Sequence, residues 1–216
     1  MKPVAASRPP VMPRVLRPQT LAGLADGFEL EAAVIAGETH TKLVARAVSL
    51  EASSLQAVEL SSCLLKASSL IDVGLDDCLL FGSDFDGSGW RRVAISGGMS
   101  SGLVLSDTVL EDVSFRQVKL TLANFRVSKL KRVSFIDCDL TEADFQAARL
   151  DQVSFRGCQL RGADFSGCQV VAADLRGAQV AALKGVAGLR GAVFAAAQII
   201  ALAPHLAAEL GLVTEP

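Results

Sequence analysis

An apolar residue recurs at every fifth position over most of this chain, and the residues between these positions vary in polarity. From Leu50 to Val180 there are twenty-seven such positions, and twenty-six of them are apolar, with Ser100 as the exception. On an α-helix, a five-residue step would spread these side chains around the whole cylinder. On a straight strand, an odd spacing would send every second one to the opposite face. The pattern therefore predicts a chain that turns a corner every five residues, with each central residue directed toward a common axis.

A second period of twenty residues is superimposed on the first. Val-Ser-Phe occurs at residues 113–115, 133–135 and 153–155. Four five-residue sides close one coil, so we expect these triplets to stack directly above one another in a solenoid.

The residue two before each central position should also face inward, because side chains alternate along a strand. This register holds all five cysteines, which are Cys63, Cys78, Cys138, Cys158 and Cys168. We expect them to be reduced thiols of a crowded core, although stacking would bring Cys138 and Cys158 close enough to bridge.

Both ends of the chain depart from the pattern. Five of the seven prolines fall within the first eighteen residues, which predicts a disordered or extended, Pro-rich basic tail over residues 1–20. The solenoid is expected over 21–195 and a C-terminal helical cap over 196–216, in which Pro204 would open a second short helix. Within the solenoid, residues 82–102 contain six glycines, which predicts a distorted coil or a bulged side.

The C-terminal segment carries an apolar stripe at helical spacing. The stripe either covers the open end of the solenoid or forms a homodimer. Its members are Ile199, Leu202, Leu206 and Leu210.

The repeated residues resemble the pentapeptide-repeat family, whose consensus runs Ala-(Asp/Asn)-(Leu/Phe)-x-x. The agreement is closest in LRGADFSGCQVVAADLRGAQV, residues 160–180. The resemblance implies an all-β fold, a right-handed quadrilateral β-helix with short strands and tight turns. In some family members the C-terminal end forms a homodimer. Other members imitate duplex DNA, bind DNA gyrase and blunt the action of quinolones.

Charge is distributed unevenly along the chain. The formal net charge is −2, but residues 26–90 hold eleven acids against three bases, whereas residues 91–190 hold fourteen bases against ten acids. The acidic stretch is a candidate interaction surface for a DNA mimic, although a mimic requires one continuous negative face. Its candidate residues are Glu51, Glu59, Asp72, Asp76, Asp77, Asp84 and Asp86.

The sequence contains no recognisable catalytic or metal-binding motif. Its two histidines, His40 and His205, lie at opposite ends of the expected rod, and no Cys or His pair has metal-ligand spacing. Aspartates that precede a central residue, such as Asp144 and Asp164, are expected to bond turn N–H groups. These features predict a protein with no enzymatic activity, cofactor, metal or direct nucleic-acid binding.

The chain has no apolar run long enough to span a bilayer and no signal-peptide pattern, which predicts a cytoplasmic protein without membrane contact. The favoured function is a protein-interaction scaffold with an unknown protein partner. The alternative is a DNA-mimicking protein that binds DNA gyrase and modulates quinolone sensitivity.

Overall fold

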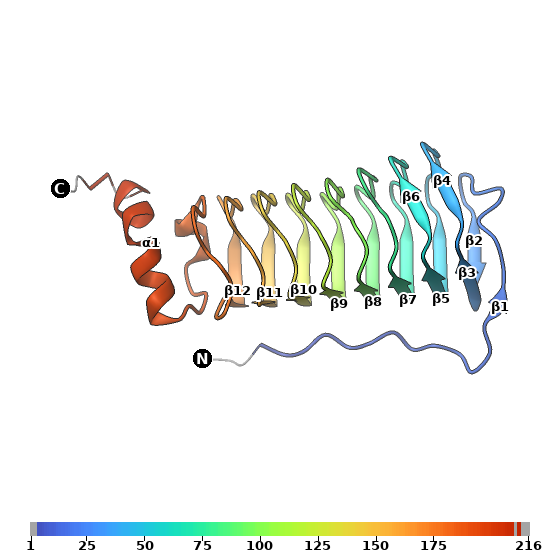
Figure 1. Ribbon diagram of the computed structural model, residues 1–216, viewed down its shortest axis with the longest axis horizontal. Helices are drawn as coiled ribbons and strands as arrows, with labels where there is room; N and C mark the ends of the chain where they lie inside the picture. The colour runs from blue at the N-terminus through green and yellow to red at the C-terminus, as the bar shows by residue number, and fades with distance from the viewer. Residues whose placement is uncertain (1–3, 210, 213–216) are drawn as a thin grey trace.

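A computed structural model describes residues 4–209, 211 and 212, and in it the chain winds into a rod-shaped β-solenoid ended by one helix (Figure 1). The short strands at the beginning are β1 (Arg17–Pro18), β2 (Glu29–Glu31), β3 (Ala33–Ala36), β4 (Thr39–Thr41) and β6 (Glu59–Ser61). The longer strands are β5 (Ser49–Gln56), β7 (Ser69–Asp76), β8 (Gly89–Ser96), β9 (Val109–Arg116), β10 (Lys129–Ile136), β11 (Arg149–Arg156) and β12 (Gln169–Asp174). The 3₁₀ turn η1 (Val186–Leu189) and the helix α1 (Ala196–Glu209) follow.

Each coil has four sides, which we number by their central residues. Side 1 is centred on Leu50, side 2 on Leu55, side 3 on Leu60 and side 4 on Leu65, and each repeats every twenty residues. The eight-residue strands cover sides 1 and 2, and they pair in parallel with a twenty-residue register, as in Phe115↔Phe135↔Phe155. On side 3 β4 pairs with β6, and elsewhere sides 3 and 4 are joined to the next coil by single bridges. The predicted stacking of the Val-Ser-Phe triplets is confirmed.

The corners are made by a left-handed backbone conformation at the second residue after a central position. Positive φ angles recur there from Ala32 to Ala182 at nearly every corner, and most of these residues are not glycine. Even the β-branched Val127 adopts φ 60°. The sharp turn at each corner explains how a five-residue repeat keeps every central side chain pointing inward.

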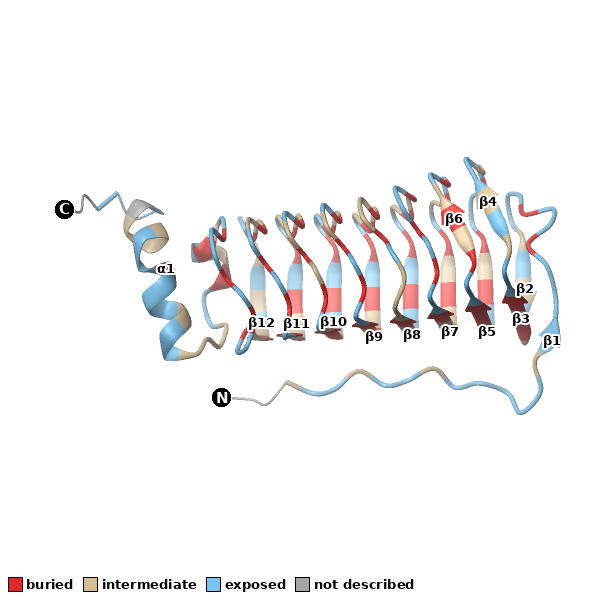
Figure 2. Ribbon diagram, in the orientation of Figure 1, coloured by how far each residue is buried: buried red, intermediate tan, exposed pale blue. Residues whose placement is uncertain are grey.

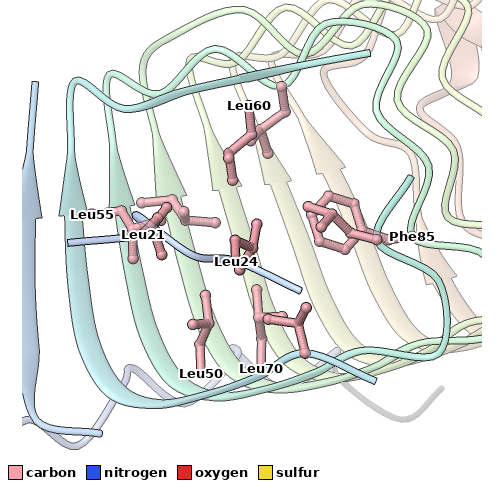
Figure 3. Close-up of a pocket in the computed structure, with 11 residues that line it drawn as sticks. Leu21, Leu24, Leu50, Leu55, Leu60, Leu70 and Phe85 are labelled. Carbon is pink, nitrogen blue, oxygen red and sulfur yellow. The ribbon is translucent and has the colours of Figure 1, made fainter. Parts of the chain in front are cut away.

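The interior is filled by the central residues and by the smaller residues two positions before them (Figure 2). Phenylalanines of one side stack in parallel, with ring centroids 5.1 Å apart for Phe135 and Phe155, and meet those of the opposite side edge-on. Figure 3 shows the interior at the N-terminal end, where Leu50 and Leu70 of side 1 lie across from Leu60 of side 3. Of the cysteines, Cys168 is half-buried and the other four are buried, and all five are free thiols.

The glycine-rich coil keeps the regular register, so the expected distortion is largely absent. β8 pairs with β7 and β9 without a shift, and Trp90 occupies the central position of side 1. The departure is confined to Gly97 and Gly98, which both have positive φ, and a Cβ at Gly98 would lie 2.1 Å from the Cys78 carbonyl oxygen. Glycine is therefore required at position 98 by close backbone approach.

Residues 4–20, which we call the strap, are extended and run along the outside of the rod, back toward its C-terminal end (Figure 1). β1 pairs with β3 at the first coil, and the Ser7 hydroxyl reaches the Ser134 hydroxyl at 2.9 Å. The basic, Pro-rich tail is thus ordered by contacts with side chains more than a hundred residues away in the sequence.

The C-terminal end closes with a shortened coil and the helix. Val193 bridges Asp174 over nineteen residues instead of twenty, so the repeat slips by one residue after Val180. α1 is one helix with Pro204 inside it, so the prediction that Pro204 opens a second helix is wrong. Gly211, which follows the helix, has positive φ.

Candidate interaction surfaces

The acidic residues of the first half do not form one face. Glu51 is on side 1, Glu59 on side 3, and the remaining candidates are divided among the corners and side 4. Asp72 is buried against Arg92, and Asp84 and Asp86 share Lys66 at 3.0 and 3.8 Å. Asp76 and Asp77 follow side 2 and are exposed. The structure therefore brings together only Asp76 with Asp77 and Asp84 with Asp86, and several of these charges are already paired.

The aspartates before central residues form local turn bonds, as expected. The Asp144 carboxylate accepts the N–H of Gln146 at 2.9 Å, and the Asp164 carboxylate accepts the N–H of Ser166 at 2.8 Å. Bonding to Ser166 and Gln146 also holds the pKa of Asp164 below its usual value despite partial burial. These carboxylates belong to the turns of the solenoid.

An ion-pair ladder occupies the corner between sides 1 and 2. Four residues of alternating charge succeed one another there at one per coil, namely Asp72, Arg92, Asp112 and Arg132. The Arg132 guanidinium donates to both oxygens of Asp112 at 2.7 Å, and the Arg92 guanidinium donates to Asp72 in the same way. Each arginine holds the pKa of its aspartate below the usual value.

A small-residue track runs along side 2, one position before each central residue. Its members are Ser54, Gly74, Ala94, Ser114, Ser134 and Ser154. The strap lies on this track, and a Cβ at Gly74 would be 3.3 Å from Cε of Met12. The track continues into a groove of about 760 Å³ beside the N-terminal part of the strap.

The groove has a polar floor and a basic wall. Ser114, Ser134 and Ser154 line its floor, strap residues Val4 to Pro9 form one wall, and the opposite wall includes the exposed Arg116 and Arg156. Arg176 lies farther along this wall and pairs with Asp174 at 2.7 Å. Sequence reasoning missed this site, although its floor is the middle residue of the repeated Val-Ser-Phe triplet.

The C-terminal stripe meets the end of the solenoid along part of its length. Leu202 is buried, Leu206 is half-buried, and Ile199 is 45 % exposed, while Leu210 lies outside the described residues. The Gln198 amide donates to the carbonyls of Leu175 and Ala178 at 2.8 and 2.7 Å. The Glu209 carboxylate accepts the N–H groups of Val186 and Ala187. The helix therefore supplies polar partners to backbone groups at the last coil.

Within the described residues, no group of His, Cys, Asp and Glu has the arrangement of a metal site, and His40 is bonded to Glu38 at 2.8 Å. Burial raises the pKa of the Cys168 thiol to about 12. A membrane-crossing helix is likewise not found in the part of the chain that the structure describes.

We compared the chain with protein-family models and with curated proteins. Residues 108–184 match the family model of the pentapeptide repeat region. A search of curated proteins finds no match.

Two of the solved structures that are similar to this chain are described here. A trypsin-treated form of QnrB1, a plasmid-mediated fluoroquinolone resistance protein, is 17% identical, with 89% of this chain and 99% of that chain covered and a TM-score of 0.52. HetL, a pentapeptide repeat protein involved in heterocyst differentiation regulation from the cyanobacterium Nostoc sp. strain PCC 7120, is 16% identical over 80% of this chain and 92% of that one, with a TM-score of 0.33.

The five-residue repeat, the match over residues 108–184 and the four-sided solenoid agree with one another. Residues 108–184 of the chain thus form a pentapeptide repeat region, and the rest of the solenoid continues the same fold.

Proposed function

We propose that this protein is a non-enzymatic interaction scaffold that binds a protein partner along the outer surface of its solenoid. The observation that carries the proposal is the groove on side 2, where an open hollow of about 760 Å³ has a serine floor and a wall with exposed guanidinium groups of Arg116 and Arg156. The interior offers no comparable space, since its leucines and phenylalanines are buried from the first coil to the last.

The rigidity of the surface supports the same function. Each coil holds its outward side chains at fixed spacing of about 4.8 Å through backbone hydrogen bonds to both neighbouring coils. Such a surface requires little ordering when a partner docks, which reduces the free-energy cost of association.

Site-specific photocrosslinking in the cell of origin tests the proposal. A photoreactive residue at position 156 lies in the groove wall, and one at position 159 lies on side 3 of the same coil and serves as the matched control. We expect one discrete protein to cross-link at position 156 but not at position 159. The cross-linked product should disappear when Arg116→Glu is added. The captured protein, once purified, should bind the solenoid again. Equal labelling at both positions, or labelling indifferent to Arg116→Glu, would contradict the groove as the interaction surface.

A second candidate is binding to DNA gyrase with modulation of quinolone sensitivity. It is favoured by the similarity to QnrB1, whose described role is fluoroquinolone resistance. The division of Glu51, Glu59 and Asp72 among different sides weighs against mimicry of a continuous phosphate surface.

Gyrase supercoiling measured with the purified protein, at low and moderate salt and with or without a quinolone, decides this candidate. Inhibition or protection from the drug that weakens with salt would support it. Unchanged supercoiling at micromolar protein would remove it and leave the scaffold proposal standing.

A further inference from the structure

The strap is attached to the solenoid through its backbone. The N–H of Val11 donates to Oδ1 of Asp72 at 2.8 Å, and the N–H of Arg8 donates to Oδ1 of Asp112 at 3.2 Å. These two carboxylates also hold Arg92 and Arg132 of the ion-pair ladder. Buried aspartates, fixed by arginines, thus present acceptors at regular intervals along the track.

The spacing of these acceptors matches that of a polyproline II segment. Asp72 and Asp112 are two coils apart, or about 9.6 Å at 4.8 Å per coil. Arg8 and Val11 are three residues apart, and three residues of polyproline II advance about 9 Å and bring the chain back to the same face.

The sequence of the strap fits this geometry. Pro9, Pro10 and Pro13 fix φ near the polyproline II value and have no N–H groups that would need partners. The track beneath is made of serine, glycine and alanine, so the backbone of an extended segment lies close to the sheet. The side chain of Met12 occupies the space above Gly74, where a larger residue of the track would meet it.

We propose that the track is a binding site for an extended, proline-rich segment of a partner protein, and that the strap is an intramolecular occupant which the partner displaces. The inference rests on the proposed scaffold function and names the class of partner. The recognition elements are the carboxylates of Asp72 and Asp112, and the required features of the ligand are two N–H groups three residues apart in a proline-rich sequence. The same surface extends into the groove, so a displaced strap would expose one continuous site.

Displacement can be tested with variants that weaken the strap but leave the track intact. In the double variant Arg8→Pro/Val11→Pro, the extended conformation is kept while both N–H donors are removed. The matched control, Arg8→Ala/Val11→Ala, loses the same side chains but keeps the donors. A fluorescent peptide with the sequence of residues 4–20 is the probe, and its affinity for each full-length variant is measured by anisotropy.

We expect the probe to bind the proline variant at least tenfold more tightly than the wild type, because a tethered strap competes at an effective concentration in the millimolar range. The alanine control should resemble the wild type. Adding Gly74→Gln to the proline variant should abolish binding by filling the floor of the track. Position 74 has ordinary φ and its neighbours in the column are serine and alanine, so this change does not require the coil to distort.

Equal affinity of the probe for the wild type and the proline variant would overturn the proposal, as would binding that survives Gly74→Gln. A wild-type chain that dimerises with rising concentration, and stops doing so with Gly74→Gln, would replace it with strap exchange between two copies. Failure of the probe to bind any variant would reject the track as a proline-rich site, whereas the scaffold function is judged separately by cross-linking at position 156.

Discussion

Trp90 and Ser100 occupy the central positions of opposite sides in one coil. Both are buried, and the indole Nε1 and the serine Oγ have no hydrogen-bond partner among the described residues. The coils before and after have leucine at both positions, as Leu70 with Leu80 and Leu110 with Leu120. The large indole therefore fills space that a second leucine fills elsewhere.

This relationship predicts strong coupling between the two positions. Trp90→Leu alone should cost about 2–4 kcal/mol by leaving a cavity, and Ser100→Leu alone about 1–3 kcal/mol by overpacking. The double variant reproduces the neighbouring leucine pair and removes two unpaired polar atoms, so its stability should return to that of the wild type or exceed it. Urea unfolding followed by circular dichroism measures the cycle, and additive losses would show that the residues do not share one volume.

The left-handed corners predict a stabilising change at Val127. This valine has φ 60° and is 55 % exposed, whereas Gly167 occupies the same corner two coils later. Val127→Gly should stabilise the protein by about 1 kcal/mol, since the strain of a β-branched residue there exceeds the added entropy of unfolded glycine. The reverse change, Gly167→Val, should destabilise by a similar amount. Thermal unfolding of both variants checks the pair, and a loss of stability in Val127→Gly would contradict the steric account.

The ion-pair ladder predicts a loss of stability in acid. Asp72 and Asp112 have folded-state pKa values below that of an unfolded aspartate, so their contribution is complete above about pH 4 and is lost as the pH falls through the folded values. The Asp72→Asn/Asp112→Asn variant should be less stable at pH 7 by about 2–5 kcal/mol, and the difference from the wild type should shrink toward pH 2. Urea midpoints between pH 2 and 7 provide the measurement. A constant difference across this range would mean that the pKa values of the two carboxylates are the same in the folded and unfolded states.

Two residues of the C-terminal helix distinguish its role as a cap from a role in dimerisation. Leu202 is 1 % exposed against the last coil, whereas Ile200 is 75 % exposed. If α1 acts only as a cap, Leu202→Asp should destabilise by several kcal/mol and open the last coil to hydrogen exchange, while Ile200→Asp should change neither stability nor molecular mass. Light scattering gives the mass. Dissociation of a wild-type dimer by Ile200→Asp would instead assign the outer face of the helix to self-association.

The solenoid was predictable because its signal lies in a short repeat. Each central residue, from Leu50 to Val180, occupies the same environment as the residue twenty positions away, so twenty-seven positions report one geometry. The inward cysteines and the turn-bonding aspartates followed from the same register. Pro204 was misjudged because a proline inside a helix is allowed where its neighbours pack, and the sequence does not display that packing.

The strap and the groove could not be predicted by the same reasoning. Proline content indicates an extended conformation, but the acceptors for Arg8 and Val11 are Asp72 and Asp112, far along the chain. The twenty-residue register places those two carboxylates on one corner, but nothing in the sequence of the strap indicates that it runs along that corner. The acidic residues lie close together in the sequence, but the coil divides them among sides 1, 3 and 4 and the corners, so they do not form one face.

The strap also relates the length of the rod to the length of the segment that precedes it. One added coil would carry Asp112 about 4.8 Å farther from Asp72, a distance that corresponds to about one and a half strap residues. If one repeat of twenty residues were duplicated between Asp72 and Asp112, the N–H groups of Arg8 and Val11 could no longer both reach their carboxylates. Two added repeats together with three added strap residues would preserve both hydrogen bonds. The strap donors thus match the rod only in steps of two coils, and growth of this protein by duplication is expected to follow the same step.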